Sequence, residues 1–141
     1  MSVKQISIFI ENKTGKLAEA TRFIADNNIN IRALSIADSE EYGILRIITE
    51  NPERTFELIT EGGYIAKKTE VLAVEMSNKP GSMSKILEVL SKADISVAYT
   101  YAFTSANTEG ACMVFRVDDN AVAKDVLTKA GINVVDRDDI F

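Results

Sequence analysis

Hydrophobic and polar residues alternate near the start of the chain, which predicts a strand with one face on an apolar core. The alternation covers residues 6–10, where every second residue is isoleucine. After a turn at residues 12–15, apolar residues recur at helical spacing over residues 17–25. Asn27 and Asn28 follow, and asparagine tolerates the left-handed conformation that often ends a helix. The first elements are therefore a strand and an amphipathic helix.

The next strand is predicted to begin at Ile29 and to contain an irregularity. Ile29 and Ile31 share one face, whereas Leu34 and Ile36 have the opposite parity. A change of parity within one strand indicates either a β-bulge or a strand that is covered on both faces.

A strand at residues 43–49, a second helix and a short last strand near residues 64–68 complete this half of the chain. Pro52 suits the first turn of the helix, and Gly62 and Gly63 suit its end. The second half repeats the order of elements, with better periodicity. Its predicted elements are strands at 72–76, 95–103, 111–117 and 132–135 and helices that begin near Met83 and Val122.

The two halves are also a repeat in sequence. Residues 6–31 align with residues 72–97 without a gap. Residues 43–63 align with residues 111–131 when two extra residues are allowed in the second copy, at 105–109. A period that spans several secondary-structure elements indicates a duplicated folding unit.

Each half has the βαββαβ order of the ferredoxin-like arrangement, a four-stranded antiparallel sheet with both helices on one face. The fold class is therefore α+β, with domains expected at residues 1–69 and 70–141. The boundary near Thr69 has no Pro, Gly or Ser linker, so we expect the two modules to pack together as one body.

Composition excludes several kinds of chemistry. The 141 residues include no histidine and one cysteine, Cys112, which removes the commonest general base and any intrachain disulfide. A net charge of −5 disfavours a nucleic-acid surface. No apolar run approaches the ~20 residues that span a bilayer, and the N-terminus does not have the pattern of a signal peptide. We therefore expect a cytoplasmic protein that binds neither nucleic acid nor membrane.

The turn after the first strand of each copy carries the candidate binding chemistry. Residues Asn12–Leu17 and Asn78–Met83 share an Asn-Lys-x-Gly pattern just before a predicted helix. Glycine lets the backbone approach a ligand closely, and the free N–H groups of a helix N-terminus attract a carboxylate. The asparagine that opens each turn can accept from an ammonium group or donate to a carboxylate. Asn30 and Ser96, which begin the next strand, are further polar candidates.

The two turns, the helices after them and the segments at 28–31 and 94–97 resemble the ACT domain family. In that family a short Asn/Asp-x-Pro-Gly turn opens the first helix, and residues of the "NIN" type open the second strand. The resemblance covers essentially the whole chain, with one departure at Thr14, where the family commonly has proline. It implies a non-enzymatic regulatory protein that binds a free amino acid at an interface between modules, without a cofactor, and that acts on a partner enzyme or regulator. Open sheet edges favour a homodimer.

The resemblance implies ligand-binding residues in both copies. They are Asn12, Thr14, Gly15, Lys16, Leu17, Asn30 and Ile31 in the first, and Asn78, Pro80, Gly81, Ser82, Met83, Ser96 and Val97 in the second. No catalytic or metal-binding residue is predicted. Proline preorganises the second turn, so we expect the second site to be the stronger one, although Lys13 and Lys16 give the first turn some attraction for a carboxylate.

Other interpretations of these residues stay open at the level of sequence. The turn glycines also fit a purely structural role, and the asparagines fit capping of the turn or helix. The aromatic stripe Tyr99, Tyr101 and Phe103 fits a module or dimer surface better than stacking on a ligand. Acidic runs at 118–119 and 136–139 are more typical of solvated turns than of cation sites.

RNA-binding modules and acylphosphatases share this order of elements. Residues 110–115 faintly resemble an RNA-recognition strand, but basic flanks are lacking and the chain is acidic. An acylphosphatase needs an arginine in the first loop, and neither residues 12–16 nor residues 78–82 contain one. An RNA-binding or purely structural interaction module is therefore the alternative to the amino-acid sensor.

Overall fold

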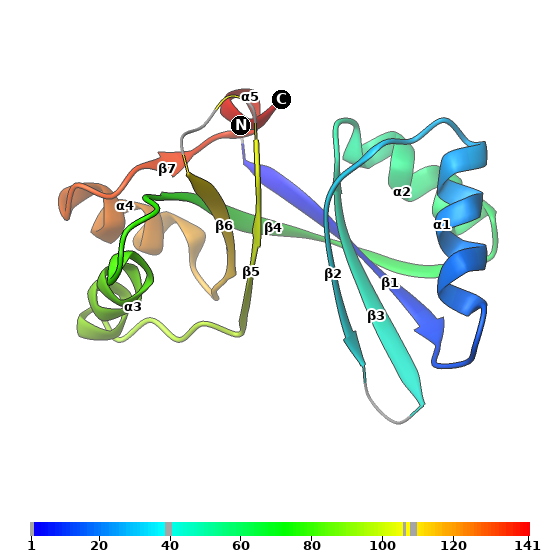
Figure 1. Ribbon diagram of the computed structural model, residues 1–141, viewed down its shortest axis with the longest axis horizontal. Coiled ribbons are helices and arrows are strands. Elements are labelled where there is room, and N and C mark those ends of the chain that lie inside the picture. Colours follow the sequence, from blue (N-terminus) through cyan, green and yellow to red (C-terminus); the bar gives the residue numbers. More distant parts are fainter. Residues whose placement is uncertain (1, 39–40, 106, 108–109) are drawn as a thin grey trace. The chain divides into compact units, whose positions relative to one another are not determined.

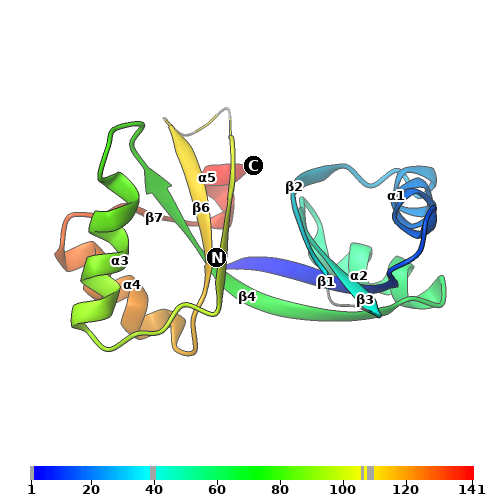
Figure 2. The ribbon, with the colours of Figure 1, turned by 60° about the horizontal axis from the view of Figure 1, so that its bottom comes forward.

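A computed structural model describes residues 2–38, 41–105, 107 and 110–141 (Figures 1 and 2). The chain forms two compact units, one made of Lys4–Thr69 and the other of Glu70–Phe141 together with the N-terminal residues through Val3. The start of the chain therefore belongs with the second half. The two extra residues expected at 105–109 lie partly outside the described residues.

The first unit has the predicted order of elements. They are β1 (Val3–Glu11), α1 (Lys16–Asp26), β2 (Ile31–Asp38), β3 (Tyr42–Thr49), α2 (Pro52–Glu61) and the first part of β4 (Ile65–Met76). The strands lie in the order β2-β3-β1-β4, and β3 is antiparallel to both β1 and β2. Both helices cover one face of this sheet, because Ile24 of α1 and Ile59 of α2 join the same core as Ile6, Ile8 and Leu45.

The second unit repeats the arrangement and adds a short terminal helix. Its elements are the rest of β4, α3 (Ser82–Lys92), β5 (Tyr99–Phe103), β6 (Ala111–Arg116), α4 (Asn120–Lys129), β7 (Val134–Val135) and α5 (Arg137–Ile140). The strand order is β7-β4-β6-β5 with antiparallel neighbours. One core unites Val74 of β4, Phe115 of β6, Leu90 of α3 and Leu127 of α4. The prediction of an α+β fold with two ferredoxin-like modules is thus confirmed.

β4 runs without a break through the position at which the sequence suggested two strands. The expected last strand of the first copy and the expected first strand of the second copy are one strand, Ile65–Met76. The polar residues Lys67, Lys68 and Glu70, which are exposed, resemble a turn in the sequence pattern. No glycine or proline interrupts them, so the backbone can stay extended while the side chains reach solvent.

The second strand of each copy begins later than predicted. β2 starts at Ile31 rather than Ile29, and β5 starts at Tyr99 rather than near Ile95. Ile95 and Val97 nevertheless pack against the core of the second unit. The alternation of apolar residues before Tyr99 therefore arises because the segment that returns from α3 is partly buried, and not because this segment pairs with a neighbouring strand.

Two predictions of local backbone geometry are confirmed. The pairing of β2 with β3 shifts register between Ile31 and Ala33, which agrees with the irregularity predicted in this strand. Asn28 lies after α1 with φ of 59°, and Asp94 has the same φ after α3. Both residues take the left-handed conformation that ends the helix.

None of the helices in the described part of the chain has the length and hydrophobicity to span a bilayer.

Candidate functional site

The turn between β4 and α3 is a type II β-turn. The N–H of Ser82 donates to the carbonyl of Lys79 at 3.2 Å, and Gly81 has φ of 87° and ψ of −6°. The third position of a type II turn needs a positive φ, which glycine adopts freely, and proline suits the second position. Pro80 and Gly81 therefore occupy the two positions that favour them. α3 begins there, with the N–H of Lys85 donating to the carbonyl of Gly81 at 2.9 Å.

The turn between β1 and α1 has the same geometry without the proline. The N–H of Lys16 donates to the carbonyl of Lys13 at 3.1 Å, and Gly15 has φ of 87° and ψ of −13°. Thr14 takes the place that proline has in the second copy. The glycine is the N-cap residue of both helices, and neither helix has a side-chain cap hydrogen bond. The N-cap residues are thus Gly15 and Gly81, and not Asn12 and Asn78.

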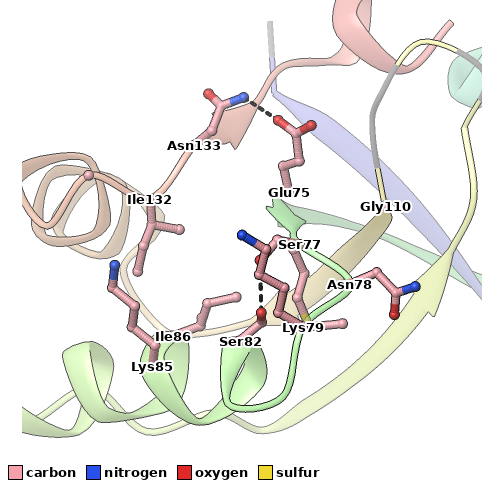
Figure 3. A pocket seen from close by; sticks show the side chains of 12 residues that line it. Glu75, Ser77, Asn78, Lys79, Ser82, Lys85, Ile86, Gly110, Ile132 and Asn133 are labelled. Carbon is pink, nitrogen blue, oxygen red and sulfur yellow. Dashed lines mark hydrogen bonds between the residues drawn. The ribbon is translucent and has the colours of Figure 1, made fainter.

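A pocket of about 530 Å³ adjoins the second turn and lies within the second unit (Figure 3). Its polar lining comes from the end of β4, the turn, the start of α3 and the segment before β7, and consists of Glu75, Ser77, Asn78, Lys79, Ser82, Lys85 and Asn133. Its apolar lining includes Met76, Ile86 and Ile132. The volume is in the range of small-molecule sites, which combine an apolar lining with a few convergent polar groups.

Two side-chain hydrogen bonds hold the polar lining in place. Asn133 Nδ2 donates to Glu75 Oε2 at 2.7 Å, and Ser77 Oγ and Ser82 Oγ lie 2.8 Å apart. Figure 3 shows the Glu75–Asn133 pair on one side of the pocket and the side chains from α3 on the other. The backbone N–H of Glu75 also donates to the carbonyl of Asn133 at 2.9 Å. Glu75 is thereby oriented through both its backbone and its side chain.

The pocket contains both signs of charge. Lys79 and Lys85 are exposed, and neither forms an ion pair with another residue in the described part of the chain. The N–H groups of the first turn of α3 have no intrahelical acceptor, and the helix dipole adds positive potential there. An oriented carboxylate thus shares one pocket with two ammonium groups.

The corresponding place in the first unit is built differently. Lys13 lies 3.3 Å from a carboxylate oxygen of Glu11, and Lys16 lies 3.5 Å from one of Glu19. Phe23 and Tyr64 pack with their ring centroids 5.5 Å apart. The lysines of the first turn are therefore neutralised locally, which weakens the attraction for a carboxylate that the sequence suggested.

The structure brings only part of the predicted site together. The pocket gathers Asn78 and Ser82 at its rim, while Pro80 and Gly81 shape the turn. Ser96 and Val97 lie past the opposite end of α3, and a helix of 11 residues is about 16 Å long. Met83 packs partly against the core.

The first copy separates its candidate residues in the same way. Asn30 and Ile31 lie past the far end of α1 from the turn that contains Gly15. Leu17, which corresponds to the partly buried Met83, is 39% exposed. Within one module, the turn and the start of the second strand are therefore separate groups of residues.

Sequence reasoning missed Glu75, Lys85 and Asn133 as members of the pocket. Asn133 is 58 positions from Glu75, so no local motif connects them. Lys85 occupies the position that Glu19 has in the first copy, and Glu75 the position of Phe9. A search for differences between the copies, rather than for matches, would have drawn attention to both.

The other candidates from the sequence have structural roles. Asp119 caps α4 by accepting from the N–H of Val122 at 3.1 Å, and Asp139 accepts from the N–H of Asp136 at 2.9 Å at the start of α5. Cys112 is buried. Among the described residues, no group of three or more His, Cys, Asp or Glu side chains is placed to hold a metal ion.

Comparison with known proteins shows the family. The family model described as "ACT domain pair" matches residues 1–141. The chain belongs to this ACT domain pair family. No curated protein matches it. A crystal structure of a protein from Bacteroides thetaiotaomicron is similar to this ACT pair, with 32% identity, a TM-score of 0.90, and coverage of 99% of this chain and 96% of that one.

Two solved structures share the fold at lower identity. The regulatory subunit of aspartate kinase from Thermus thermophilus, in a ligand-free form, is 12% identical to the ACT pair, with a TM-score of 0.64. The two chains are covered to 92% and 93%, respectively. A structure titled as aspartokinase alpha and beta subunits is 19% identical, with a TM-score of 0.62 and the same coverage. These likenesses extend along almost the full length of the ACT pair.

Proposed function

We propose that this ACT pair is a non-enzymatic sensor that binds a free amino acid. We propose the pocket next to the Asn78–Met83 turn, within the second module, as the site, whereas the resemblance to the family implied an interface between modules. The observation that carries the proposal is the presence of an oriented carboxylate and two ammonium groups in one pocket. A free amino acid has one group of each sign, and a site that offers both opposite charges can bind both of its ends.

The second turn is the better candidate of the two. Pro80 and Gly81 preorganise its backbone, which lowers the ordering cost of binding. The lysines of the first turn have carboxylates of their own beside them. The set Asn12, Thr14, Gly15, Lys16 and Leu17 therefore stays a secondary proposal.

Regulation requires that the ligand favour one state of the protein over another. We propose that amino-acid binding changes how the ACT pair interacts with a partner enzyme or regulator, and that the protein is a homodimer. The family to which the chain belongs and its lack of histidine both support a regulatory rather than a catalytic role. A cytoplasmic location stays a prediction.

Thermal-shift measurement with each free amino acid tests the proposal directly. A ligand at about 100 times its dissociation constant adds about 2.7 kcal/mol to the free energy of unfolding, which gives an easily measured rise in Tm. Asn78→Ala should reduce this rise, and the matched variant Asn12→Ala should leave it unchanged. A larger loss from Asn12→Ala would mean that the first turn is the main site.

RNA binding, the alternative function, predicts a different result from that of the amino-acid sensor. It would appear as an affinity for single-stranded RNA that falls steeply with salt. We expect no such affinity for a chain with a net charge of −5. A chain that binds RNA and responds to no amino acid would refute the sensor proposal.

A further inference from the structure

The balance of charge in the second-module pocket points to a class of ligand. Lys79 and Lys85 contribute two positive charges and Glu75 contributes one negative charge, so the ionised side chains of the lining sum to +1. We propose that the ligand is a dicarboxylic amino acid, aspartate or glutamate in kind, whose net charge is −1 at neutral pH. This inference rests on the proposed function and narrows it.

The three charged groups come from three segments of the unit. Glu75 is on β4, Lys79 is in the turn, and Lys85 is on the second turn of α3. A ligand with one ammonium and two carboxylate groups has a counter-charge for each of the three. The ammonium group of the ligand pairs with the carboxylate of Glu75, which Asn133 holds in place. The two ligand carboxylates pair with the two lysines.

Other amino acids match the pocket less well. A neutral amino acid leaves one lysine without a counter-charge, and a basic amino acid brings a third positive charge to a lining that already has two. The lysines lie at the exposed rim, where single ion pairs are weak. We therefore expect about a tenfold preference for the acid over its amide, which corresponds to about 1.4 kcal/mol.

The two copies of the module separate this chemistry from the needs of the fold. A duplicated unit keeps in both copies what the fold requires, as the glycine of each turn illustrates with the same φ of 87°. Of the three charges of the pocket, Lys79 has its counterpart in Lys13, and the other two are not kept. At the position of Lys85 the first copy has Glu19, and at the position of Glu75 it has Phe9. Glu75 and Lys85 are therefore not a requirement of the module.

Titration calorimetry on the full chain tests the inference with matched ligands. The probes are L-aspartate with L-asparagine, and L-glutamate with L-glutamine, because each pair has nearly the same shape and differs by one charge. L-lysine is the probe of opposite charge. We expect one of the two acids to bind about tenfold more tightly than its amide, with the difference shrinking as salt is raised.

Variants of two lysines on α3 complete the test. Lys85→Glu installs the residue of the first copy at an exposed position, and it should abolish the preference for the acid. Lys92→Glu makes the same change on the same helix outside the pocket, and it should leave the preference intact. Binding of both amides as tightly as their acids, or equal loss in the two variants, would overturn the inference while the sensor proposal stands. Failure of every free amino acid to bind would overturn the proposed function itself.

Discussion

Replacement of Gly81 by alanine separates the backbone requirement of the turn from binding. Gly81 has φ of 87°, and a Cβ atom built on it would have no neighbour within 4 Å. The cost of Gly81→Ala is therefore conformational and not steric. An L-residue in a left-handed conformation costs about 1–2 kcal/mol, partly offset by the lower entropy of the unfolded alanine chain. We expect the free energy of unfolding to fall by about 1 kcal/mol.

Gly15→Ala is the matched control. Gly15 has the same φ of 87°, and a Cβ atom there also has no neighbour within 4 Å. The two variants should lose equal stability, which urea denaturation would show as a fall of about 0.5 M in the midpoint for a slope near 2 kcal/mol/M. The amino-acid affinity should fall only in Gly81→Ala, because that turn adjoins the pocket.

Three outcomes of this comparison would contradict the reasoning. Unchanged stability in both variants would show that the positive φ is not a constraint. A much larger loss in one of them would show that a contact, and not the backbone conformation, decides the cost. Equal loss of amino-acid affinity in both would place the ligand away from the second turn.

Three further predictions concern stability. Gly62→Ala should cost about 1–3 kcal/mol by overpacking, because its Cβ would overlap the Phe23 ring, and a double mutant with Phe23→Leu should recover part of the loss in urea denaturation. Asp119→Ala should lower the free energy of unfolding by about 1 kcal/mol, because α4 loses its N-cap side chain. In urea denaturation Asp119→Ser, which keeps a capping side chain, should be as stable as the parent, and Asp119→Leu should not. Burial raises the pKa of the Tyr64 phenol above its ordinary value of 10.0. The stability that the neutral phenol contributes is therefore complete below pH 10 and is lost as the pH rises through the pKa of the folded state. When the pH is raised from neutral to above about 10, the free energy of unfolding should fall less in Tyr64→Phe than in the parent. An equal fall in both proteins would contradict this prediction.

The sequence predicted the modules well because their signals are local. Period-two and helical patterns identified the strands and helices, and a change of parity indicated the irregularity near Ile31. The continuity of β4 was not predicted, because a run of polar residues in a solvated strand has the composition of a turn. The late start of β5 was missed because buried residues alternate in the same way whether or not they bond in a ladder.

The candidate site was only half predictable. The turn around Gly81 has a local signature, and the structure places it beside the pocket. Glu75 and Asn133 meet only because β4 and the segment before β7 become neighbours in the sheet. Such a contact depends on topology and register, which local patterns do not specify.

The grouping of the first residues with the second half of the chain matters for folding during synthesis. Val3 is 2% exposed and lines a pocket with residues Glu70–Ala73 and the segment around β7. During translation Val3 leaves the ribosome before its partners, which emerge only with the second copy. Such distant contacts form late, because the long loop between them must close first. A fragment that begins at Glu70 would lack Val3, a buried residue that groups with this unit, so division of the gene at the internal repeat would leave the second module less stable.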